Sequence, residues 1–272
     1  MRNTRQLQFY PLHGFSNREL QRESGLGTPV LPFRNAWIGS LEYFGDSEPD
    51  DIEERDFFEF FSLPPSELKA VIGSVYAAGP ERAAWKEKLQ LGIQGFAATS
   101  PASLASELNR MIWESSLNEI YATIFLARVD SRSRQLTYVN AGHEAALLIR
   151  AESGRILRLE RTGAVLGLSH RSTFGQRSIP ISRGDTLIAF SDGICEALSW
   201  NGGQFSERRL LEIIRPRSAM APRQIVRAIL DGTAEFTGSA PERDRTVIAA
   251  RIAGSPPAMP QARSELALAM SG

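Results

Sequence analysis

The chain has 272 residues, with 31 lysines and arginines against 31 aspartates and glutamates, and its only cysteine is Cys195. This length and an apolar fraction of 42% are enough to bury a full core, so the composition excludes a largely disordered chain. A net charge of zero argues against binding to nucleic acid or a membrane surface through the overall field, and one cysteine excludes an intramolecular disulfide framework. The chain lacks an apolar run of about 18 residues and an apolar signal segment, so we expect a cytoplasmic protein.

The composition divides the chain into three parts. Residues 1–33 are polar and rich in glycine and proline, which predicts an irregular N-terminal segment. Residues 254–272 combine prolines with small side chains, which predicts a flexible tail. Residues 34–253 carry the patterns of regular structure, so we expect one domain there.

Within this domain, predicted strands are interrupted twice by a pair of helices. The strands cover residues 56–63, 68–75, 121–129, 135–140, 145–150, 156–159, 173–179, 185–191 and 246–252. The first helix pair covers residues 81–98 and 101–115, and the second begins after Ser206, a possible N-cap, and at Pro222. Because this order is not βαβ alternation, we expect an α+β fold in which helices cover antiparallel sheets.

Acidic clusters stand at the ends of three predicted strands. Asp56 and Glu59 are three residues apart, so on an extended strand they face opposite sides and reach one ion only where the strand twists or bulges. Asp192 leaves a buried strand beside Gly193, a common way to present a carboxylate to a hard cation, although a capped turn fits the pattern equally well. Asp244 lies in a charged run that, by itself, is typical of a solvated surface.

The order of these segments resembles the metal-dependent serine/threonine phosphatases of the PPM class, and more narrowly their SpoIIE-type branch, which regulates alternative sigma factors. The matching segments are residues 136–143, 162–168, 182–197 and 204–211. The resemblance covers about residues 35–253 and implies a β-sandwich flanked by helix pairs, in α-β-β-α layers. It also implies two Mn²⁺ or Mg²⁺ ions that activate a water for attack on phosphoserine or phosphothreonine, with no covalent intermediate.

The resemblance further implies four metal-binding aspartates, and two of them are retained here as Asp56 and Asp192. The family segment Ile-Gly-Asp-Val-Ser-Gly-x-Gly is matched by residues 72–79, Ile-Gly-Ser-Val-Tyr-Ala-Ala-Gly, so Ser74 replaces the aspartate that bridges the metals. Thr246 aligns the last segment, Asp-Asp-x-Thr in the family, and places Arg243 at the ligand position.

These replacements take negative charge away from the implied two-metal centre. At short range and an effective dielectric near 20, each misplaced unit charge is worth a few kcal/mol, which costs orders of magnitude in metal affinity. In one alternative, the guanidinium of Arg243 takes the place of a metal and binds phosphate bidentately. In the other, Asp244 and Glu59 supply oxygens and leave one weak metal site.

Two functions follow from the resemblance. The domain either removes phosphate from a regulatory protein of the anti-sigma-antagonist type, or binds such a phosphoprotein without turnover as a pseudophosphatase. The residues at positions 74 and 243 favour the second function. His143, in an Asn-Ala-Gly-His turn that the family shares, is expected to have a structural role.

Overall fold

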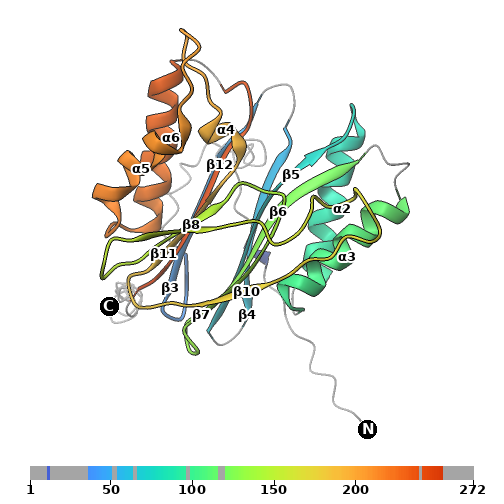
Figure 1. Ribbon diagram of the computed structural model, residues 1–272, viewed down its shortest axis with the longest axis horizontal. Helices are drawn as coiled ribbons and strands as arrows, with labels where there is room; N and C mark the ends of the chain where they lie inside the picture. Colours follow the sequence, from blue (N-terminus) through green and yellow to red (C-terminus); the bar gives the residue numbers. More distant parts are fainter. Residues whose placement is uncertain are drawn as a thin grey trace, which may run out of the picture.

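The computed structural model describes residues 11–12, 36–50, 54–63, 66–95, 99–115, 120–238 and 241–253. These residues form two antiparallel sheets packed face to face, and each sheet is covered on its outer side by helices (Figure 1). The predicted α+β class and the α-β-β-α layers are confirmed. Among the helices described, none combines the length and the apolar character that a membrane span requires.

The first sheet, sheet A, has the strand order β1-β4-β5-β6-β7-β10. Its strands are β1 (Pro11–Leu12), β4 (Asp56–Leu63), β5 (Glu67–Tyr76), β6 (Tyr121–Asp130), β7 (Gln135–Ala141) and β10 (Arg177–Pro180). Helices α2 (Glu81–Gly95) and α3 (Pro101–Ser115) cover its outer face. Ser100 caps α3, since its hydroxyl oxygen accepts the N–H of Ser103 at 3.2 Å.

The second sheet, sheet B, has the order β2-β3-β12-β11-β8-β9. Its strands are β2 (Ala36–Ile38), β3 (Leu41–Glu48), β8 (Ala146–Ile149), β9 (Ile156–Leu159), β11 (Thr186–Phe190) and β12 (Arg245–Ile252). Helices α5 (Ser206–Ile214) and α6 (Pro222–Thr237) cover it, and the 3-10 turn η1 (Arg215–Arg217) links them. The short helix α4 (Asp192–Cys195) follows β11 directly.

Three apolar layers hold these elements together. Phe60, Phe125 and Tyr138 belong to the layer between the two sheets. A second layer lies between sheet A and its helices, and a third between sheet B and α5–α6. The alternation along β4 shows the division: Phe58 and Phe60 face the other sheet, whereas Phe57 and Phe61 face the helices.

Strands β2 and β3 were not predicted, because acidic residues interrupt the apolar pattern of residues 36–48. In β3, Leu41 and Tyr43 face the sandwich, while Asp46 lies on the opposite side and pairs with Arg227 of α6 at 2.8 Å. Asp46 on the acidic side of this strand is therefore buried against an arginine of α6, a long-range contact that no local pattern reveals.

Most other predicted bounds agree with the structure to within one residue, but the start of β10 and the N-cap of α5 do not, and the predicted end of α2 lies outside the described residues. Strand β10 begins at Arg177 and not at residue 173, since Phe174 packs into the layer beneath α2 and α3 and bridges Gly163. Ser206 does not cap α5: it is the first helical residue, with φ of 63°, and the N-cap is Phe205. Helix α2 is described to Gly95, and residues 96–98 of the prediction lie outside the described residues.

Of the predicted irregular segment, the structure describes only Pro11–Leu12, whose backbone pairs with Phe60 and Phe61 of β4. The predicted tail, residues 254–272, lies outside the described residues. Both assignments remain predictions.

Candidate functional site

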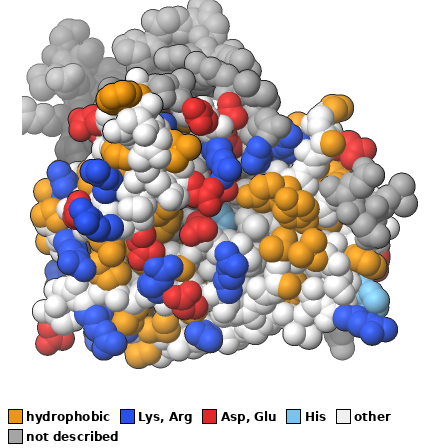
Figure 2. Space-filling view, turned by 45° about the horizontal axis from the view of Figure 1, so that its top comes forward, with side chains coloured by type: hydrophobic (Ala, Val, Ile, Leu, Met, Phe, Trp, Pro, Cys, Tyr) orange, Lys and Arg blue, Asp and Glu red, His pale blue; other side chains and the backbone are white. Residues whose placement is uncertain are grey.

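All the predicted site residues except Glu59 gather where four strands begin or end at one end of the sandwich. Asp56 opens β4 and stands opposite Ser74 of β5 in the strand register. Asp192 follows β11, and the pair Arg243–Asp244 precedes β12. Figure 2 shows this end from outside, where acidic and basic side chains are interspersed beside an apolar patch. We call it the site end.

Asp56 is buried, with a side chain that makes one short hydrogen bond. The Ser74 hydroxyl donates to its Oδ1 at 2.6 Å, whereas Oδ2 lies buried without a hydrogen bond of normal geometry among the described residues. The pKa of this carboxyl is raised to about 7, first by burial and then by the negative charge of Asp244, while hydroxyls, that of Ser74 first, offset part of the shift. Ser74 therefore contributes a hydroxyl donor where a carboxylate was expected.

Asp244 points into the protein and organises the start of β4. Its Oδ1 accepts the N–H of Asp50 at 2.6 Å, and its Oδ2 accepts the N–H groups of Arg55 at 2.5 Å and Asp56 at 2.7 Å. Burial raises the pKa of Asp244, and these N–H donors oppose the shift. Its oxygens are thus engaged with backbone.

Gly193 allows α4 to approach the start of β12 closely. A Cβ on Gly193 would lie 2.1 Å from the backbone oxygen of Asp244, which no side chain tolerates. The Ser191 hydroxyl also donates to that oxygen at 3.1 Å and accepts the Thr246 N–H at 3.0 Å. The Ser-Asp-Gly turn therefore joins the end of β11 to the start of β12 and fixes Asp192 beside Arg243.

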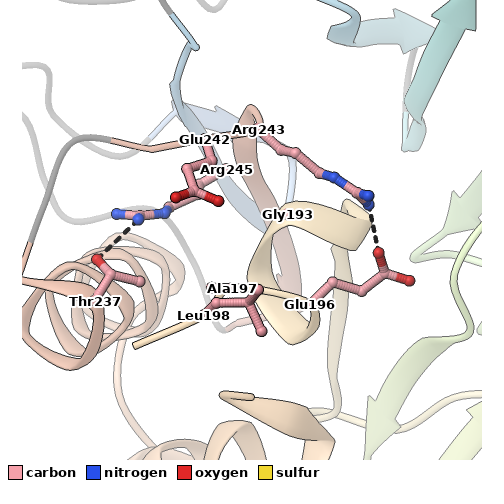
Figure 3. A pocket seen from close by; sticks show the side chains of 8 residues that line it. All are labelled: Gly193, Glu196, Ala197, Leu198, Thr237, Glu242, Arg243 and Arg245. Carbon is pink, nitrogen blue, oxygen red and sulfur yellow. Dashed lines mark hydrogen bonds and ion pairs between the residues drawn. The ribbon is translucent and has the colours of Figure 1, made fainter. Parts of the chain in front are cut away.

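Arg243 occupies the mouth of the site and binds two carboxylates. Its Nη1 lies 3.2 Å from Oδ2 of Asp192 and also donates to Oε2 of Glu196 (Figure 3). Asp192 and Glu196 are four residues apart across α4, so one helical turn presents both to the same cation. Both contacts use the same nitrogen, and the side chain of Arg243 is 47% exposed.

Behind this ion pair lies a pocket of about 110 Å³. Figure 3 shows its walls, formed by α4, the end of α6 and the start of β12. Arg245 lines its floor almost fully buried, and its Nη2 donates to the Thr237 hydroxyl at 2.9 Å. Glu196 and Glu242 stand on its walls, so charges of both signs face the cavity.

Glu59 does not join the other candidate ligands. Strand β4 pairs continuously with β5 from residue 56 to residue 63, so Asp56 and Glu59 face opposite sides. Glu59 is buried beneath α2, where burial raises its pKa to about 7 and Gln90 and Gln94 partly offset the shift. The expectation that Glu59 supplies an oxygen to the site is wrong for this geometry.

A conventional two-metal centre does not fit these residues. Across the described part of the chain, no three His, Cys, Asp or Glu side chains are grouped so that they could hold a metal ion. Asp56 accepts a hydrogen bond from a hydroxyl, and Asp244 accepts hydrogen bonds from three backbone N–H groups. Arg243 is paired with Asp192, the carboxylate that a metal ion would need as a ligand. The charge and the ligand count that two hard cations require are both lacking.

His143 is buried at the same end. Thr123 Oγ1 lies 3.1 Å from its Nδ1, and its backbone N–H donates to the side-chain oxygen of Asn140 at 2.9 Å. Burial lowers its pKa to about 4, so the imidazole is neutral near pH 7. These contacts agree with the structural role expected for this turn.

A pair of tyrosines near Asp56 and Asp192 was not among the predicted site residues. Tyr76 ends β5 and Tyr121 begins β6, and their rings stack with centroids 4.7 Å apart and planes 8° apart. Arg55 lies over the Tyr76 ring, 5.6 Å from its centroid. Tyr76 stands where the phosphatase segment has serine, and this replacement was the available signal.

Comparison with known proteins agrees with the fold. Residues 67–253 match the family model described as Stage II sporulation protein E (SpoIIE). Phosphoserine phosphatase RsbU of Bacillus subtilis is 26% identical over 229 residues, which are 83% of this chain and 66% of that protein. The chain thus spans slightly less than two thirds of this relative.

Solved structures show the same architecture. The RsbU and RsbW domains of a Mycobacterium tuberculosis protein superpose with a TM-score of 0.67 at 21% identity, over 81% of this chain and 63% of that one. The PP2C phosphatase domain of SpoIIE from Bacillus subtilis, with a fragment of its regulatory domain, gives 0.67 at 15% identity, over 80% and 63%. Neighbours with this fold have been solved with magnesium and with two manganese ions.

Proposed function

Because this chain belongs to the SpoIIE family of PPM phosphatase domains, we propose that it acts in partner-switching signalling by binding a phosphorylated regulatory protein through Arg243, without hydrolysis at a two-metal centre. The observation that carries the proposal is the ion pair between Arg243 and Asp192. A protein cation stands beside the carboxylate on which a metal would depend, and Asp192 and Glu196 hold it in place, so its remaining donors are oriented before a phosphate arrives.

The geometry of Arg243 supports phosphate binding. A guanidinium offers donors along two edges, and Asp192 and Glu196 both use Nη1. Within the described residues the edge formed by Nε and Nη2 has no recorded acceptor, and it is the pair of donors that binds a phosphate bidentately. The two carboxylates orient the side chain, which reduces the entropy that it loses on binding.

The partner in this proposal is a small protein of the anti-sigma-antagonist type that carries phosphoserine or phosphothreonine, and the setting is the cytoplasm. The relative named phosphoserine phosphatase supports this choice of phosphorylated residue. The exposure of Arg243 supports a protein ligand, because a side chain on a surface is accessible to a phosphate held on another chain.

Hydrolysis of the same phosphoprotein is the second candidate function. The buried Oδ2 of Asp56 favours hydrolysis, because it lies near the negative charge of Asp244 and a bound cation would stabilise its negative charge. One weakly held Mn²⁺ or Mg²⁺ is the cofactor that this alternative requires. Dependence of turnover on added metal distinguishes it from the first.

The test is calorimetric titration, in the presence of EDTA, of a phosphoserine peptide and its unphosphorylated counterpart into the folded protein. We expect binding of the phosphorylated peptide alone, and a loss of at least about ten-fold in affinity for Arg243→Gln, as for removal of a charged hydrogen-bonding group. Arg183→Gln, an exposed arginine on the turn before β11 at the opposite end, is the matched control. Equal binding of both peptides would contradict the proposal.

A further inference from the structure

The pocket behind the ion pair of Arg243 and Asp192 holds charged groups that the proposed function leaves unused. Arg245 lies on its floor with 3% of its side chain exposed, and Glu242 stands on its wall (Figure 3). Removing a charge from water is costly unless the buried group finds hydrogen-bonding partners. The partners that these two side chains have within the protein therefore decide what the pocket can bind.

Arg245 keeps hydrogen-bond donors for a ligand. Its Nη2 donates to the Thr237 hydroxyl at 2.9 Å. Its Nη1 lies 3.5 Å from Oε2 of Glu48, which is longer than the roughly 2.7–2.9 Å of a charge-assisted hydrogen bond. A guanidinium carries several further N–H groups, and within the described residues those of Arg245 have no recorded acceptor. The floor of the pocket thus offers a cation with unused donors.

Glu242 supplies the complementary charge. It is exposed, and within the described residues the ion pairs of the two arginines that line the pocket are all made with other carboxylates. Glu196, the other acidic residue of the wall, already binds Arg243, so those two charges offset each other. One guanidinium and one carboxylate, not paired with each other, are left to face the pocket.

The size of the pocket limits its ligand. Its volume is about 110 Å³, and an apolar cavity of about 150 Å³ admits benzene, so a molecule of about five or six non-hydrogen atoms fits. Ala197 and Leu198 lie across the pocket from Arg245 and Glu242 in Figure 3 and add a short apolar surface. A nucleotide or a sugar phosphate is too large to be enclosed.

We propose that the pocket binds a small zwitterion of the α-amino acid class, with its carboxylate on Arg245 and its ammonium group on Glu242. The hydrogen or methyl side chain of such a ligand faces Ala197 and Leu198, which suits glycine or alanine. The inference goes beyond the proposed function, because it involves neither the phosphate nor the phosphoprotein.

The distribution of charge favours a zwitterion over a ligand with one kind of charge. An anion would lie beside the carboxylates of Glu196 and Glu242, and a cation would lie beside the guanidinium groups of Arg243 and Arg245. A neutral amide meets both kinds of charge, but its dipole gains less from each than a full opposite charge does. A ligand with both charges pairs each free group of the pocket with its opposite.

The experiment follows the amide chemical shifts of the folded, isotope-labelled protein near pH 7 while L-alanine is added. Acetate, methylammonium, acetamide and inorganic phosphate are titrated in parallel, since each lacks at least one of the two charged groups of L-alanine. We expect L-alanine to bind with a Kd of about 1 mM or below and to shift residues 193–198 and 242–245. Each other probe should bind at least about ten-fold more weakly.

Two variants and a control separate recognition from folding. Glu242→Gln changes an exposed side chain and should weaken L-alanine binding at least about five-fold, because the ammonium group loses its carboxylate. Arg245→Lys keeps the buried charge and should also weaken binding, because lysine lacks the fork that binds a carboxylate with two hydrogen bonds. Glu235→Gln, on the exposed side of α6 and outside the pocket lining, is the matched control and should change nothing.

Each outcome supports or overturns the proposal. Acetate or phosphate binding as tightly as L-alanine would show a plain anion site, and acetamide binding as tightly would show that the charges are not recognised; either result overturns it. Unchanged affinity in Glu242→Gln, or no shift with L-alanine at about ten-fold above the expected Kd, would also overturn it. Because none of these titrations contains a phosphopeptide, their failure leaves the proposed function intact, and a loss of phosphopeptide binding leaves this inference intact.

Discussion

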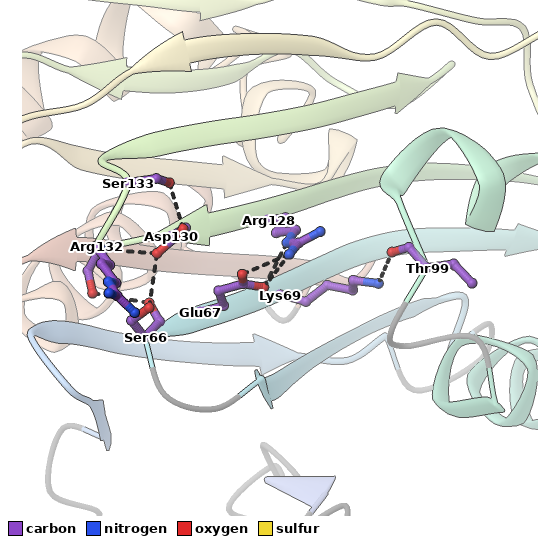
Figure 4. Close-up of polar contacts among 9 residues, drawn as sticks. Ser66, Glu67, Lys69, Thr99, Arg128, Asp130, Arg132 and Ser133 are labelled. Carbon is purple, nitrogen blue, oxygen red and sulfur yellow. Dashed lines mark hydrogen bonds and ion pairs between the residues drawn. The ribbon is translucent and has the colours of Figure 1, made fainter. Parts of the chain in front are cut away.

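At the end of the sandwich opposite the site, Asp185 and Glu67 lie against arginines, whereas at the site end Asp56 and Asp244 lie against each other. Glu67 accepts two hydrogen bonds from Arg128, at 2.7 and 2.8 Å, and nearby Asp130 accepts the Ser66 and Ser133 hydroxyls (Figure 4). At the site end, the backbone N–H of Asp56 lies 2.7 Å from the Asp244 carboxylate.

The difference shows which end serves stability. A buried carboxylate with a cation and donors resists removal, because its loss leaves several groups unpaired. A buried carboxylate beside a like charge raises the free energy of the folded state. Such an arrangement is typical of sites that are kept for function. At the site end, the carboxylate of Asp56 therefore carries an electrostatic cost from its burial and from the nearby charge of Asp244.

The largest expected effect belongs to Asp185. Its Oδ2 accepts Nη1 of Arg150 at 2.7 Å and the N–H of Ser182 at 2.9 Å, and its Oδ1 accepts the N–H of Ala151 at 2.9 Å. Asp185→Ala should lower the free energy of unfolding by about 2–4 kcal/mol, because a partly buried cation and two N–H groups lose an acceptor. Urea unfolding measures this change. If the variant is as stable as the unaltered protein, or loses phosphopeptide affinity when folded, the contrast between the ends is wrong.

Replacing Glu59 should have the opposite effect and raise the free energy of unfolding at high pH. Its folded-state pKa is raised from 4.5 to about 7, so between these values the folded state binds more protons than the unfolded state and stability falls as the pH rises. Glu59→Gln removes the buried charge. It should raise the free energy of unfolding by up to about 3 kcal/mol at pH 8 and leave it unchanged near pH 4.5.

Urea unfolding of this variant and the unaltered protein at both pH values checks the prediction. Glu87→Gln, an exposed carboxylate on α2, is the matched control and should be neutral at both. A gain of equal size at the two pH values would show that packing, and not ionisation, is responsible.

The smallest change in stability is expected for Asp192→Asn. Its side chain is 26% exposed and that of Arg243 is 47% exposed, so solvent screens the pair and the variant should lose less than about 1 kcal/mol. Phosphopeptide affinity should nevertheless fall by about three- to ten-fold, because Arg243 is less well oriented. Calorimetry and urea unfolding on one sample compare the two effects. Unchanged affinity would show that Asp192 does not orient Arg243 for binding.

Local patterns predicted most of the fold. Residues 56–63, 101–115 and 156–159 form the predicted elements with the predicted bounds, because their apolar periodicity coincides with their buried faces. Strand β3 was not predicted, since Asp46 on its acidic face is buried only by its contact with Arg227 of α6. The family segments predicted that Ser74 and Arg243 replace metal-binding aspartates. Their contacts with Asp56 and Asp192, and the inward turn of Asp244, depend on how separate strands meet, which periodicity does not encode.

We propose above all that a protein cation takes the place of metal at this site. Its most direct test is calorimetric titration of the folded protein with Mn²⁺, with hydrolysis of a phosphoserine peptide followed on the same sample. The double variant Ser74→Asp with Arg243→Asp, which returns two carboxylates, is the comparison. We expect no binding by the unaltered protein at millimolar Mn²⁺, no turnover, and measurable binding by the double variant. Tight Mn²⁺ binding with Mn²⁺-dependent turnover by the unaltered protein would contradict the account.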